Sequence, residues 1–130
     1  MEAERVFADT NLFLRYLTND IPEQADAFEK VLRRAEQGEI VLVTNSLVIA
    51  EIVWTLEYYY RLPPSAVQDK VLAILNTPGL EVADSDRVLQ AILWHVEKSV
   101  DFIDAYNAAW MAEHSIKTVF TFEQKHFKRF

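Results

Sequence analysis

The chain has 130 residues, of which 51% are hydrophobic and 25% charged, a composition that indicates a globular domain and excludes a disordered tail. The absence of cysteine excludes disulfides and thiolate zinc sites, and the formal net charge of −7 argues against a broad basic surface for nucleic acid. No apolar run is long enough to span a membrane and the N-terminus lacks a signal-peptide pattern, so we expect one cytoplasmic domain over residues 1–130.

The predicted elements alternate between short apolar strands and helices with apolar side chains at helical spacing. In chain order we expect a strand at residues 6–8, helices at 10–17 and 23–37, a strand at 40–43, helices at 47–60 and 64–75, a strand at 80–83, helices at 86–98 and 102–114, a strand at 119–121 and a terminal loop at 122–130. This order is typical of a parallel α/β sheet flanked by helices.

Four carboxylates lie beside a predicted strand end or early in a helix. Asp9 ends the first strand, Glu51 follows the second by little more than a helical turn, Asp104 lies in the first turn of its helix, and Glu123 follows the last strand. Because parallel strands place their carboxyl ends at one edge of a sheet, we expect Asp9, Glu51 and Glu123 near that edge. The helix with Asp104 follows another helix, so pattern alone does not place it there.

Carboxylates that meet in a cleft repel each other unless they bind a cation, and oxygen ligands favour Mg²⁺ or Mn²⁺. Such a site suits phosphoryl transfer. Each acid also has a structural explanation. Asp9 can be a helix cap, Asp101 has capping-box spacing to Asp104, and Glu123 can be a surface acid. Glu51 interrupts an apolar run, where an acid needs a partner or a function.

The motifs together resemble a known family. The segments DTNLFLRYL at 9–17, NDIPEQA at 19–25, SLVIAEIVWTL at 46–56, DFIDA at 101–105 and VFTFE at 119–123 are similar, in this order, to those of PIN-domain proteins. Length and motifs are most similar to the VapC toxins of type II toxin–antitoxin systems.

The resemblance implies a parallel sheet of four or five strands and a Mg²⁺- or Mn²⁺-dependent ribonuclease, in which a metal-activated water hydrolyses the phosphodiester. It implies that Asp9 and Asp104 hold the metal and that Glu51 completes its shell or orients the water. Glu123 would be the fourth acid, where the family commonly has Asp. Side chains implied to orient the acids or the water are Thr10, Asn11 and Thr121.

The resemblance also implies partners, namely an RNA substrate, a cognate antitoxin and a homodimer or toxin–antitoxin hetero-oligomer. Cations expected to meet the RNA backbone are Arg15, Lys125 and Lys128, although Arg15 is equally compatible with a structural ion pair. Side chains that could line an apolar groove for an antitoxin helix are Val48, Ile49, Ile52 and Phe28. Trp54 is compatible with either an interface or the core.

Two other functions remain open at this point. An aspartate-nucleophile phosphatase would use Asp9, but those enzymes place a second Asp two residues later, where this chain has Asn11. A non-enzymatic PIN-like binding module with a degenerate site is left open by Glu123. Glycine-rich phosphate loops are excluded, because the chain has only Gly38 and Gly79.

Overall fold

The computed structural model describes residues 3–122 and 124–130. Its three strands are β1 (Glu4–Phe7), β2 (Ile40–Thr44) and β3 (Leu80–Val82). The helices are α1 (Thr10–Thr18), α2 (Pro22–Glu36), α3 (Ser46–Tyr58), α4 (Pro64–Leu75), α5 (Ser85–Glu97), α6 (Phe102–Glu113) and α7 (Gln124–Phe127). The predicted alternation of strands and helices is therefore confirmed.

The three strands form a parallel sheet in the order β1-β2-β3. Val6 pairs with Leu42, and Leu42 pairs with Leu80, so one row of apolar residues crosses the whole sheet. The central strand β2 alternates between buried and half-buried residues, as expected for a strand covered on both faces. Its sequence Ile-Val-Leu-Val-Thr suits this place because β-branched side chains pack well on a pleated surface.

Short-range signals in the sequence set the starts of the helices. Asn45 caps α3, because its Oδ1 accepts a hydrogen bond from the amide of Val48 at 3.1 Å. Pro22 and Pro64 occupy the first turns of α2 and α4, where the missing N–H of proline costs no helical hydrogen bond. Gly38, with φ of +81°, follows α2, and its amide donates to the carbonyl of Ala35 at 3.0 Å.

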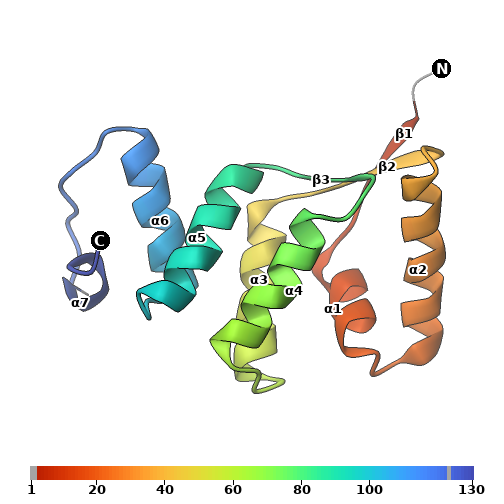
Figure 1. Ribbon diagram of the computed structural model, residues 1–130, viewed down its shortest axis with the longest axis horizontal. Helices are drawn as coiled ribbons and strands as arrows, with labels where there is room; N and C mark the ends of the chain where they lie inside the picture. The colour runs from red at the N-terminus through yellow and green to blue at the C-terminus, as the bar shows by residue number, and fades with distance from the viewer. Residues whose placement is uncertain (1–2, 123) are drawn as a thin grey trace.

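Figure 1 shows that the molecule is elongated. The sheet lies at one end with α1 and α2, whereas α5, α6 and α7 lie toward the other, with α3 and α4 between. The core runs through α3, where Ile49, Ile52 and Leu56 are fully buried, and continues into α4 and α5. No helix of the described residues is long and apolar enough to cross a membrane.

The C-terminal part differs from the sequence prediction. Residues 119–121 form no strand, so the described part of the sheet has three strands where four or five were expected. Phe120 is 93% exposed and Phe122 is 97% exposed, and this stretch lies at the end of the molecule away from β1 (Figure 1). An apolar β-branched run becomes a strand only where a sheet edge is within reach. The expected loop at residues 122–130 contains the short helix α7.

Candidate functional site

Asp9 lies where β1 ends and α1 begins. The preceding residue, Ala8, is fully buried and fixed on both sides, because its amide donates to the carbonyl of Val43 and its carbonyl accepts from Oγ1 of Thr44, both at 2.9 Å. Asp9 itself is exposed, and its Oδ1 accepts from the amide of Leu12 at 3.4 Å. The carboxylate therefore caps α1, as predicted, while it still faces solvent at the carboxyl edge of the sheet, where ligands of parallel α/β folds bind.

The neighbours of Asp9 take different positions. Thr10 is buried at the start of α1, whereas Asn11 is exposed. Arg15, one turn further, forms an ion pair with Asp20 at 3.0 Å, so the structural alternative for this arginine is the one observed. The hydroxyl of Tyr60 donates to the same carboxylate at 2.7 Å, and this hydrogen bond is the main reason that the pKa of Asp20 is lowered.

Glu51 lies on the exposed side of α3, whereas Ile52 and Val53 are buried on the other side. The expectation that the acid lies in an apolar interior is therefore wrong, because helical rotation separates Glu51 from the buried residues next to it in sequence and leaves it beside the exposed Leu47 and Trp54. The carboxylate is available to a ligand. Trp54 is 61% exposed, so it is not a core residue.

Asp104 makes a contact that the sequence did not indicate. Its Oδ2 lies 2.9 Å from Nδ1 of His126, which comes from α7. The same ring nitrogen lies 3.4 Å from the backbone amide of Asp101. Asp101 is the predicted cap of α6, since its Oδ2 accepts from the amide of Ile103 at 3.2 Å. No spacing signal could have linked His126 to Asp104, because α7 reaches α6 only through the tertiary fold.

A second network joins α3, α5 and α6 near the carboxyl ends of β2 and β3. The guanidinium of Arg87 donates to Glu113 through Nε at 2.8 Å and through Nη2 at 2.6 Å, and to the hydroxyl of Tyr106 at 3.0 Å. The Tyr106 hydroxyl in turn donates to Oγ of Ser46 at 3.1 Å. The hydrogen bond to Glu113, followed by that to Tyr106, raises the pKa of Arg87. No pattern in the sequence indicated these four residues.

His95 forms the most buried polar link between helices. Its Nε2 lies 2.6 Å from Oε2 of Glu57 on α3, and its Nδ1 lies 2.5 Å from the carbonyl of Val100. Both ring nitrogens face oxygen acceptors, so the ring links α3 to the backbone that follows α5. His95 and His126 also line one open cavity of about 330 Å³ together with Tyr58 and Asp101.

The remaining predicted residues lie in the C-terminal stretch. Glu123 lies outside the described residues. Thr121 and Lys128 line a shallow cavity of about 210 Å³ with Val119 and Phe127. Lys125 is exposed on α7. The two lysines therefore lie on the surface around α7, while Arg15 lies on α1.

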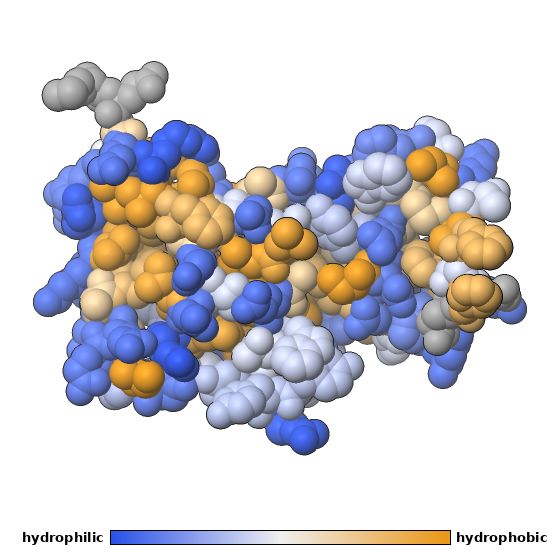
Figure 2. All heavy atoms as spheres, turned by 180° about the vertical axis from the view of Figure 1, so that it is seen from behind, coloured by the Kyte–Doolittle hydropathy of each residue, from blue (hydrophilic) through white to orange (hydrophobic). Residues whose placement is uncertain are grey.

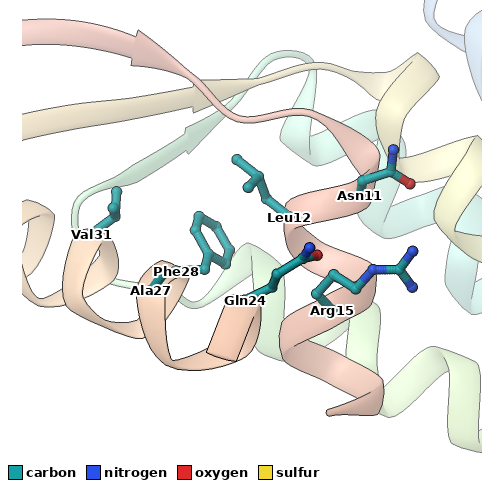
Figure 3. Close-up of a pocket in the computed structure, with 7 residues that line it drawn as sticks. All are labelled: Asn11, Leu12, Arg15, Gln24, Ala27, Phe28 and Val31. Atoms are coloured by element: carbon teal, nitrogen blue, oxygen red, sulfur yellow. The ribbon is translucent and has the colours of Figure 1, made fainter. Parts of the chain in front are cut away.

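The apolar groove is elsewhere than predicted. Val48, Ile49 and Ile52 are buried in the core and cannot line a surface groove. The structure instead has a groove of about 220 Å³ between α1 and α2, in which Leu12, Phe28 and Val31 supply the apolar wall. Figure 3 shows that these three side chains lie beneath the strands, with the polar ends of Arg15 and Gln24 at one side. Of the predicted groove residues, only Phe28 belongs to it.

The predicted acids suit a hard cation in chemistry, since all are carboxylates and both Asp9 and Glu51 are exposed. The acids that the structure describes do not form one cluster. Within residues 3–122 and 124–130, no three Asp, Glu or His side chains are close enough to hold a metal ion. Asp9 belongs to the sheet edge, Glu51 to the open side of α3, and Asp104 to the contact with His126.

A sequence model described as the PIN domain matches residues 6–130. No curated protein and no solved structure matches the chain significantly. The match runs from Val6, within β1, through α7, and it includes every predicted acid. PIN domains are generally nucleases, and they typically use divalent metal ions. The chain belongs to the PIN-domain family.

Proposed function

We propose that the chain is a Mg²⁺- or Mn²⁺-dependent ribonuclease and the toxin of a VapC-like type II toxin–antitoxin pair. The observation that carries the nuclease proposal is the position of Asp9 within a family match that spans the chain. Its backbone is fixed by the bonds of Ala8 to Val43 and Thr44, while its carboxylate is exposed at the carboxyl edge of the sheet. A rigid backbone with an exposed carboxylate is what metal-assisted phosphodiester hydrolysis needs.

In this proposal Asp9 and Asp104 would hold the cation, and Glu51 would complete its shell or orient the attacking water. A bound divalent ion supplies charge neutralisation for the phosphate and a lower pKa for a water molecule. Thr10, Asn11 and Thr121 are the proposed orienting residues, and Glu123 is the proposed fourth acid. Lys125 and Lys128 are proposed contacts for the RNA backbone.

Asp9 allows the chemical and structural roles to be separated. Asn is as good a helix cap as Asp, so Asp9→Asn keeps the cap of α1 and removes only the negative charge. We expect this variant to fold like the wild type and to lose RNA cleavage by on the order of 100-fold or more. Asp104→Asn is expected to lose activity similarly. Asp26→Asn, which changes an exposed acid on α2, is the matched control.

The measurement is cleavage of a structured RNA by purified protein with Mg²⁺ or Mn²⁺, compared with the same reaction in excess chelator. Wild-type activity that depends on the ion, is lost in Asp9→Asn and is kept in Asp26→Asn supports the proposal. Absence of cleavage with either ion would overturn the proposal in favour of a non-enzymatic binding module, and wild-type levels of cleavage by Asp9→Asn and Asp104→Asn would show that these acids do not carry the activity. Glu123→Gln tests the fourth acid in the same assay.

The toxin role has a separate test. Induced expression of the chain in a bacterial cytoplasm is expected to stop growth, whereas expression of Asp9→Asn is not. Co-expression of the cognate antitoxin should restore growth and yield a toxin–antitoxin complex on purification. If the wild type and Asp9→Asn affect growth equally, the toxin proposal fails even when cleavage is observed in vitro.

A further inference from the structure

An aromatic stripe runs along the open side of α3, defined here as Leu47, Glu51, Trp54 and Tyr58. Their spacing of four, three and four residues places them on one helical face. All four are exposed: Leu47 by 78%, Trp54 by 61% and Tyr58 by 58%, with Glu51 also in the exposed class. In Figure 2, pale side chains of intermediate hydropathy gather low in the middle of the surface, near the end of α3.

The two rings of the stripe are arranged for stacking. The centroids of Trp54 and Tyr58 lie 5.4 Å apart, and their planes are inclined by only 30°. Because both side chains are more than half exposed, each presents ring surface to solvent in addition to its contact with the other ring. Exposed aromatic pairs of this kind are the platforms on which proteins stack unpaired bases.

The surroundings of the stripe connect it to the proposed active site. Glu51 is itself a member, one turn before Trp54. At the other end, Tyr58 lines the cavity of about 330 Å³ that also contains Asp101 and His126, and His126 contacts Asp104. The stripe therefore runs from Glu51 to the cavity that Asp101 and His126 line. The loop that follows α3 carries an exposed cation, Arg61, three residues after Tyr58.

We propose that Trp54 and Tyr58 form a stacking site for unpaired bases of single-stranded RNA beside Glu51. This inference rests on the proposed ribonuclease function and specifies its substrate as single-stranded at this point. The bases stack on the two rings and the sugar–phosphate backbone passes on the solvent side toward Arg61. Bases within a duplex are already stacked on each other, so double-stranded RNA cannot use the site.

A second copy of the chain is a poorer occupant of the stripe. A twofold interface would pair the stripe with itself. Each copy would then bring Glu51 into the contact, and the stripe contains no Lys or Arg to neutralise the two carboxylates. Burying charges without partners is unfavourable. Single-stranded RNA would instead place neutral bases on the rings and leave both Glu51 and the phosphates in solvent.

The test measures binding apart from cleavage. A fluorescein-labelled single-stranded RNA octamer is titrated with protein in EDTA, and binding is followed by fluorescence anisotropy. Trp54→Ala and Tyr58→Ala are each expected to weaken binding about tenfold, the order expected for loss of one base–ring stack. Tyr59→Ala is the matched control, because Tyr59 is 74% exposed but lies off the stripe, in contact with Tyr60. It should bind like the wild type.

Two further probes identify the bases as the ligand groups. A duplex of the same sequence and an abasic octamer with the same phosphates should bind more weakly than the single strand, and neither should be affected by Trp54→Ala. Equal binding of the abasic strand, equal losses in Tyr59→Ala and Trp54→Ala, or wild-type binding by both stripe variants would overturn the inference. The inference would also be overturned if light scattering showed a dimer that Trp54→Ala dissociates with no change in RNA affinity.

The two proposals fail separately. If the wild type cleaves RNA but the stripe variants bind normally, the stacking site is wrong and the nuclease proposal stands. If binding follows the stripe but no ion supports cleavage, the nuclease proposal is wrong and the chain binds single-stranded RNA through the stripe. Circular dichroism of each variant checks that the fold is unchanged.

Discussion

The sheet end and the helical end of the molecule are held together by different interactions. Around β1 and β2, polar groups are satisfied by backbone partners: Thr44 donates to Ala8, and Asp9 and Asn45 cap the next helices. Around α5 and α6, the links are pairs of charged or aromatic side chains, as in the contact of Arg87 with Glu113. The difference teaches that the position of Asp9 is set by the backbone, whereas that of Asp104 depends on side-chain contacts between helices.

The largest loss of unfolding free energy is expected at the helical end, where the His95 side chain bonds to both Glu57 and the carbonyl of Val100. His95→Ala removes a ring that is 7% exposed and leaves the Glu57 carboxylate, 15% exposed, without its partner. Leaving buried acceptors without their hydrogen-bond donor costs about 3 kcal/mol of unfolding free energy. Urea denaturation followed by circular dichroism measures it. His114→Ala, at an exposed histidine of the same end, should cost far less; equal losses would show that the buried pair is not special.

Arg87→Ala is expected to have the next largest effect. The Arg87 side chain is 16% exposed and bonds both Glu113 and Tyr106, and hydrogen bonds to charged groups of this kind stabilise by about 2 kcal/mol. The matched control is Arg33→Ala, because the Arg33 side chain is 69% exposed in its pair with Glu29 and should contribute less than about 0.5 kcal/mol. If both variants unfold at the same urea concentration, side-chain pairs do not hold the helical end.

At the sheet end, Thr44→Val tests the hydrogen bond from the Thr44 side chain to the backbone carbonyl of Ala8. Valine keeps the shape of a residue that is 4% exposed but removes the donor to the Ala8 carbonyl, which costs about 1.5 kcal/mol. Because this bond fixes the residue before Asp9, RNA cleavage should fall more than stability alone explains, measured well below the unfolding midpoint. A loss of stability with unchanged cleavage would show that this hydrogen bond does not position Asp9 for RNA cleavage.

Asp9→Ala is expected to cost about 1 kcal/mol, the usual value of a helix cap, and Asp9→Asn close to nothing. Thermal unfolding of the two variants under identical conditions gives the difference. Equal stability of the two would mean that the bond to the Leu12 amide, at 3.4 Å, adds nothing to α1.

The smallest expected effect is on the pH dependence of folding stability. The hydrogen bond from Tyr60 lowers the pKa of Asp20 below its ordinary 3.8, so its contribution to stability is present above pH 3.8 and is lost as the pH falls through the lowered pKa. Tyr60→Phe removes the main cause of the shift. The variant should therefore lose less stability than the wild type between pH 5 and acid conditions, by denaturation at several pH values. An identical loss would assign the acid dependence to other carboxylates.

The sequence predicted the sheet end well because its signals are local. The apolar runs of β2 and β3 and the cap Asp9 all act within a few residues. The resemblance to PIN-domain proteins supplied what these signals do not, namely that distant acids belong to one site. The family match supports that grouping at the level of the whole chain and does not test the role of any single acid.

The sequence by itself determined the parallel α/β order, the helix starts and the family, because periodicity, capping and motif order are properties of neighbouring residues. Only the tertiary structure decided that Glu51 faces outward beside Trp54 and Tyr58, that His126 meets Asp104, and that residues 119–121 lie away from β1. Those outcomes depend on which helix faces are covered and on contacts between residues far apart in the chain. Such contacts leave no periodic signal in the sequence, since many different partners satisfy the same side chain.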